Sequence, residues 1–173
     1  MEESTLKYWK DAGHVARRTL EAMKLELTPG KSFHQVIESA ERYIHRHGGK
    51  PAFPGTIAVN DLAAHFTTDH AVNHVEGWDG EMELQKGDCV KIDFGVHIKG
   101  HIADNALTFE IGNGNEHTEQ IKAAREARDA AIEMLHPGTP WHKVGQAGAQ
   151  PSLDAGFQPI RNLCGHQLKP WQL

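Results

Sequence analysis

Hydrophobic positions spaced three and four residues apart predict a helix over residues 4 to 27, which Pro29-Gly30 ends. Its apolar face carries Leu6, Ala12, Val15, Ala16, Leu20 and Met23. Ser32 followed by Gln35 has the spacing of a capping box, and this box predicts a second helix that stops at Gly48-Gly49. The first fifty residues are therefore expected to form a pair of helices.

Between residues 90 and 111 the pattern changes to alternation, which is typical of strands. Lys99-Gly100 lies at the middle of this stretch and predicts a two-residue hairpin turn. One face of the hairpin is apolar and is predicted to face the core; it carries Val90, Ile92, Phe94, Val96, Ile98, Leu107 and Phe109. If Ile98 opposes His101 across the turn, Asp93 opposes Ala106 on the other face.

The remaining segments give weaker patterns. Residues 51 to 66 read as extended chain around two prolines, and residues 67 to 87 as a polar surface loop. A third helix is predicted over residues 117 to 135, and a fourth begins at Thr139-Pro140. Pro151 is expected to end that helix near Gly148 or to leave the segment poorly formed, because proline is unfavourable inside a helix.

The chain contains a repeat with an offset of 108 residues. The run from Pro29 to Val36 is echoed by the run from Pro137 to Val144, and Gly48 and Pro51 are matched by Gly156 and Pro159 at the same offset. We interpret this as an internal duplication within one domain that spans residues 1–173, with a first copy over about 4–111 and a second from about 117. The hairpin of the second copy would fall after Leu173, so we expect the domain to be truncated here.

Composition restricts the function classes. Hydrophobic residues make up 39% and charged residues 24% of the 173 positions, which is ordinary for a globular protein. A net charge of −5 without a basic run argues against nucleic-acid binding. No apolar stretch approaches the roughly 18 residues that a membrane span needs. Cys89 and Cys164 are isolated, which fits free thiols in a reducing cytoplasm.

The polar face of the predicted hairpin carries Asp93 and Asp104 as diagonal neighbours, about 6–7 Å apart at Cβ. Small side chains surround them at Gly95, Ala106 and Thr108. Two carboxylates this close repel each other and favour a cation between them, which a divalent metal pair would provide. The alternative is an exposed ribbon whose aspartates are simply solvated, and the pair alone does not decide between the two.

Two histidines stand in settings that suit a site. His65 follows an apolar run, and His166 follows a short predicted strand in the second copy. Each is either a hydrogen-bonded structural residue or a ligand. Imidazole nitrogen together with carboxylate oxygen would suit zinc, manganese, iron or cobalt better than calcium.

Three ordered segments resemble the type II methionine aminopeptidases, above all the archaeal ones: KPAFPGTIAVNDLAAHFTTD, GDCVKIDFGVHIKGHIADNALTF and PIRNLCGHQL. The resemblance covers essentially the whole chain and implies an α/β (α+β) pita-bread fold, present as its first half and the start of the second. It further implies that Asp93 chelates one divalent metal ion, that Asp104 bridges two, and that His166 binds the other. His65 matches a histidine near the scissile amide, and Phe53 a wall of the methionine pocket.

This family removes the N-terminal methionine from nascent proteins in the cytoplasm, so the resemblance implies such peptides as substrates, an encounter at the ribosome and a monomer when complete. It also implies two glutamates and a second histidine beyond Leu173, so we expect the chain alone to bind metal weakly and to turn over little. The HFTTD segment and Pro151 depart from the family pattern. Two alternatives stay open: another pita-bread metallopeptidase resembling proline dipeptidases, and a non-catalytic pita-bread binding module.

Overall fold

The computed structural model describes residues 3–62, 65–68, 82–112 and 114–173. It divides into two compact units. The first contains Met1–Gly114 together with His166–Leu173, and the second contains Asn115–Gly165. None of the helices in the described residues is long and apolar enough to cross a membrane.

The first unit is built on an antiparallel sheet centred on β3 (Cys89–Ile98). On one edge, β1 (Lys50–Pro51) and β2 (Thr56–Val59) pair with the end and the beginning of β3. On the other edge, β4 (His101–Glu110) pairs with β3 along its whole length. Ile98 opposes His101 and Asp93 opposes Ala106, which confirms the hairpin register predicted from the Lys99-Gly100 turn.

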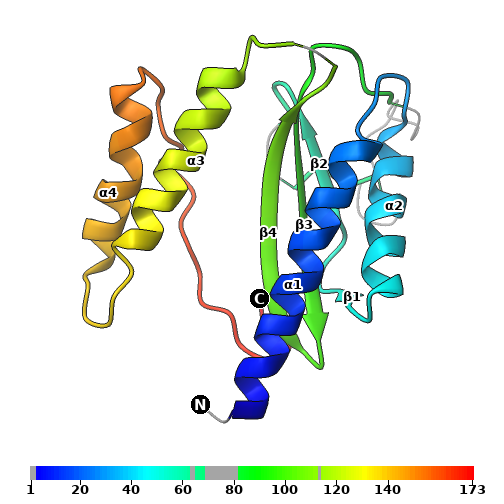
Figure 1. Ribbon diagram of the computed structural model, residues 1–173. Coiled ribbons are helices and arrows are strands. Elements are labelled where there is room, and N and C mark those ends of the chain that lie inside the picture. Colours follow the sequence, from blue (N-terminus) through cyan, green and yellow to red (C-terminus); the bar gives the residue numbers. More distant parts are fainter. Residues whose placement is uncertain (1–2, 63–64, 69–81, 113) are drawn as a thin grey trace. The chain divides into compact units, whose positions relative to one another are not determined.

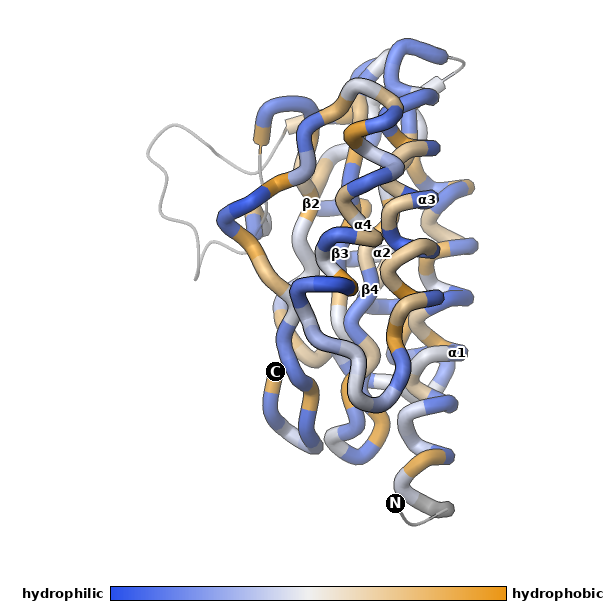
Figure 2. The backbone as a smooth tube through the Cα atoms, turned by 90° about the vertical axis from the view of Figure 1, so that its left-hand side faces the viewer, coloured by the Kyte–Doolittle hydropathy of each residue, from blue (hydrophilic) through white to orange (hydrophobic). Residues whose placement is uncertain are grey.

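Helices α1 (Glu3–Glu26) and α2 (Phe33–Arg46) lie together on one face of this sheet (Figure 1). Figure 2, turned by 90°, shows the C-terminal end of the chain on the opposite side of the sheet from α1. The core lies between the helices and the even-numbered positions of β3, and its fully buried members include Met23, Val36, Ile44, Ile57, Leu84, Val90, Ile92, Phe94 and Val96. Leu107 and Phe109 on β4 are only half-buried.

The start of α2 follows the sequence prediction. Ser32 Oγ accepts a hydrogen bond from the Gln35 amide, and the Gln35 side chain accepts one from the Ser32 amide. This reciprocal pair satisfies two backbone donors that the first turn of a helix leaves free. Ser32 also bridges to Glu83, so residues predicted as polar loop connect to the helix start; residues 69–81 of that predicted loop lie outside the described residues.

The second unit contains α3 (Thr118–Glu133) and α4 (Trp141–Asp154) packed on each other. The prediction that Pro151 ends α4 near Gly148 is wrong, because the helix continues to Asp154. The Ala155 amide donates to the Pro151 carbonyl, so the last turn closes after the proline. Gly148 lies at the contact with α3, because a Cβ built there would fall 3.1 Å from Ala131 Cβ and 3.2 Å from the Ala127 carbonyl oxygen.

Candidate functional site

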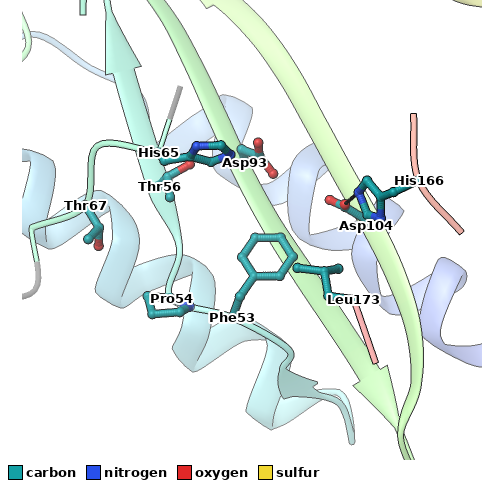
Figure 3. Close-up of a pocket in the computed structure, with 9 residues that line it drawn as sticks. All are labelled: Phe53, Pro54, Thr56, His65, Thr67, Asp93, Asp104, His166 and Leu173. Carbon is teal, nitrogen blue, oxygen red and sulfur yellow. Dashed lines mark ion pairs between the residues drawn. The ribbon is translucent and has the colours of Figure 1, made fainter. Parts of the chain in front are cut away.

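The first unit contains a cavity of about 280 Å³ on the face of the sheet away from α1 and α2 (Figure 3). Its lining residues are Phe53, Pro54, Thr56, His65, Thr67, Asp93, Asp104, His166 and Leu173. All five of the site residues proposed from the sequence are among them. They come from the segment before β2, the loop after it, the β3–β4 hairpin and the C-terminal segment, so four parts of the chain meet here.

Asp93 lies on the polar face of β3, and its side chain is only 19% exposed. Burial raises the pKa of its carboxyl, since the charged form loses hydration. Lys91, whose Nζ lies 3.7 Å from Asp93 Oδ2, opposes that shift in the pKa, whereas the charge of Asp104 adds to it and His65 opposes it. The Asp93 carboxyl group is thus partly shielded from water, and added positive charge nearby would favour its ionised form.

Asp104 on β4 faces the C-terminal segment. Its Oδ2 lies 3.4 Å from Nε2 of His166, and Figure 3 shows the two side chains pointing toward one another. Both are partly exposed, at 30% and 50%. The structure thus brings a histidine from residue 166 next to a hairpin carboxylate 62 positions earlier in the sequence.

These donors are not arranged around a single point. Within the described ranges, no three His, Cys, Asp or Glu side chains converge closely enough to hold a metal ion. Asp104 pairs with His166, while Asp93 pairs with Lys91. The kinds of donor nevertheless fit a transition metal, because they combine carboxylate oxygens with an imidazole nitrogen.

His65 and Thr56 form the end of the cavity next to Asp93 (Figure 3). The backbone of His65 has φ +72°, in the left-handed region that non-glycine residues seldom adopt. Thr56 pairs directly with Asp93 across β2 and β3 and is 8% exposed. Its Oγ1 is the one buried side-chain oxygen or nitrogen without a hydrogen-bond partner among the residues described.

The apolar part of the cavity is formed by Phe53, Pro54 and Leu173. Phe53 lies against Gly95 of β3, because a Cβ built at Gly95 would fall 2.3 Å from Phe53 Cε1. The missing side chain at Gly95 therefore makes the space that the phenyl ring occupies. This close approach gives Gly95 a role that its place beside Asp93 in the sequence only suggested.

Sequence reasoning missed four of the lining residues: Pro54, Thr56, Thr67 and Leu173. Thr56 could have been found from the pairing of β2 with β3, but residues 51–66 read as loosely extended chain and gave no register. Leu173 lies seven residues after His166, and no periodicity or motif in the sequence indicates that it reaches the cavity.

The chain is similar to known metallopeptidases over almost its whole length. The model of metallopeptidase family M24 matches residues 7–170. The chain is 37% identical to the methionine aminopeptidase of Thermococcus onnurineus over 162 residues, which make up 94% of this chain and 52% of that protein. The chain spans about half the length of the first curated relatives it matches.

Solved structures show the same arrangement of elements. Methionine aminopeptidase from Rickettsia prowazekii has a TM-score of 0.83 at 21% identity over 97% of this chain and 67% of its own. Prolidase from Pyrococcus furiosus has a TM-score of 0.73 at 24% identity over 90% of this chain and 44% of its own. At such identities the likeness describes the fold, which is common to both kinds of peptidase.

Proposed function

The chain belongs to metallopeptidase family M24 and has the pita-bread fold of that family, and from this premise we propose that it forms part of a cytoplasmic methionine aminopeptidase. Its substrates would be the N-terminal Met-peptides of nascent proteins. The observation that carries the proposal is the single cavity that gathers Asp93, Asp104, His166, His65 and Phe53. Archaeal relatives of 31–38% identity are named methionine aminopeptidase, which favours this activity over that of a proline dipeptidase.

We propose that Asp93, Asp104 and His166 are the residues of this cavity that would hold divalent metal ions. When bound, such ions would lower the pKa of a water molecule and stabilise negative charge on the peptide carbonyl. Asp93 and Asp104 would offer carboxylate oxygens to such ions, and His166 an imidazole nitrogen. The two aspartates would contribute the negative charge that the ions neutralise.

The other end of the cavity would take the substrate. Phe53 and Leu173 provide an apolar wall for the methionine side chain. A volume of about 280 Å³ lies just below the range of pockets that hold drug-sized ligands, which suits one side chain and the atoms of the first peptide bond. His65 lies beside Asp93 and Thr56 (Figure 3), where its ring would hydrogen-bond the peptide group next to the scissile bond.

The metal ligands proposed here are three side chains, fewer than two metal ions of four or more ligands each require. We therefore propose that the 173-residue chain by itself binds metal weakly and hydrolyses little Met-Ala peptide. Measurable turnover by the purified chain would contradict this part of the proposal.

Isothermal titration of the purified chain with Co²⁺ tests the metal site. We expect binding that is weakened at least about tenfold in the D104N and H166Q variants, because each substitution removes a ligand. H136Q is the matched control, since His136 is exposed and lies in the second unit. Co²⁺ binding that survives both site substitutions unchanged would refute the assignment. Hydrolysis of an Xaa-Pro dipeptide in preference to Met-Ala by a longer form would favour the dipeptidase alternative.

A further inference from the structure

Within the first unit, the C-terminal segment His166–Leu173 contacts the β3–β4 hairpin at two points. One is the contact between His166 and Asp104. The other is Trp171, whose amide donates to the Gly100 carbonyl at 2.8 Å and whose ring lies 5.1 Å from that of His97, measured between centroids. The segment is therefore attached both at the cavity and at the hairpin turn.

The indole of Trp171 packs flat against Gly100. A Cβ built at Gly100 would fall 2.4 Å from both Cε2 and Nε1 of the indole, so the ring occupies the space that a side chain there would need. Gly100 also has φ +82°, which glycine adopts without strain. Trp171 itself is held in a small turn, because the amides and carbonyls of Lys169 and Gln172 bond each other reciprocally at 3.0 Å.

The two attachments restrict the conformations that the segment between them can adopt. Asp104 lies four residues after Gly100 on β4, which corresponds to about 13 Å along a strand. The five steps along the chain from His166 to Trp171 can span at most roughly 17–18 Å when fully extended, and the turn at Lys169–Gln172 shortens that reach. The position of the indole therefore limits where the imidazole can go.

We propose that Trp171 is a positioning residue for His166: its indole, anchored on Gly100 and His97 at the hairpin turn, holds the C-terminal segment so that the imidazole faces Asp104. The effect of Trp171 on metal binding rests on the proposed function, whereas its effect on the order of the C-terminal segment does not. Trp171 itself lines no part of the cavity and is 73% exposed, so it contributes through the segment that it anchors.

The order of the segment is measured on the metal-free, ¹⁵N-labelled chain by the heteronuclear NOE of the His166 and Leu173 amides. We expect rigid values in the wild type and clearly lower values in W171A, because the tail loses its second attachment. W171F, which keeps a flat ring for Gly100, is expected to retain the wild-type values. W141A is the control, since Trp141 is 78% exposed and begins α4 in the second unit. Unchanged values in W171A would overturn the proposal.

The consequence for metal is measured by titration with Co²⁺ and by its visible absorption spectrum. We expect W171A to weaken binding roughly 10-fold or more, in the range of residues that orient a metal ligand. In an H166A background, W171A should have no further effect, because Trp171 acts through that imidazole. An equal loss in both backgrounds would overturn the positioning role. A wild type that binds no Co²⁺ would instead contradict the proposed function, while the NOE values still decide the role of Trp171.

Discussion

Thr56 and Thr19 are two buried threonines in opposite situations, and replacing each with valine tests how the cavity is built. Thr56 Oγ1 is buried without a partner. Thr19, which is fully buried in α1, donates from its hydroxyl to the Val15 carbonyl at 2.8 Å. Valine has nearly the same shape as threonine, so each substitution changes a hydroxyl into a methyl group and little else.

The expected effects have opposite signs. An unpartnered buried hydroxyl costs about 1–3 kcal/mol in lost hydration, and burying a methyl group in its place adds up to about 0.8 kcal/mol. Allowing for incomplete burial, we expect T56V to raise the free energy of unfolding of the metal-free chain by about 1–2 kcal/mol. T19V loses a satisfied hydrogen bond and is expected to lower it by about 0.5–1.5 kcal/mol.

Urea unfolding followed by circular dichroism measures both variants, with the m-value checked for constancy so that a shift in midpoint reports stability. Thermal melts should agree, at about 2–4 °C for each kcal/mol in a chain of this size. A T56V variant that is destabilised as much as T19V would refute the reasoning, because it would mean that the Thr56 hydroxyl has a partner in solution.

Two further predictions concern the same cavity. Burial raises the pKa of Asp93 in the folded chain above its ordinary value of 3.8, so the folded state binds the proton more tightly than the unfolded state does. The stability of the wild type should therefore fall as pH rises from below 3.8 through the raised pKa, and the stability of metal-free D93N relative to the wild type should increase over that window and then level off. A difference in urea midpoints that stays flat between pH 3 and 8 would contradict this. G95A forces its new methyl group against Phe53, so we expect a loss of about 1–3 kcal/mol that F53A in the same chain largely relieves. G13A in α1, where nothing lies within 4 Å of the added Cβ, should instead gain about 0.5–1 kcal/mol, and equal losses at both glycines would show that packing on Phe53 is not the cause.

The parts of the fold that were predictable are those fixed by local chemistry. The Lys99-Gly100 turn determines the register of the hairpin, and the Ser32–Gln35 box determines where α2 begins. The prediction for the end of α4 is wrong, because it rests on the intrinsic cost of proline alone and the packing of α4 on α3 cannot be predicted from the local sequence. Local sequence therefore indicates where a helix or a hairpin turn begins, but not which other element packs against it.

The candidate site was predictable only in part for the same reason. Asp93 and Asp104 follow from strand alternation and hairpin register, which are local. That His166 faces Asp104 depends on how a segment more than sixty residues away returns to the sheet, and only the resemblance to a family indicated it. Thr56 went unnoticed, because its partner strand could not be assigned without the long-range pairing of β2 with β3.

The central position of β3 in the sheet determines which parts of the first unit unfold last. Among the described strands, β3 alone is paired on both edges, so its amides should be the slowest to exchange with deuterium. Asp93 belongs to this slowest layer, whereas His166 belongs to a short tail held by a few contacts. The His166 end of the cavity can therefore open locally while the Asp93 end stays folded. Ligand binding would be lost at denaturant concentrations at which the sheet is still folded.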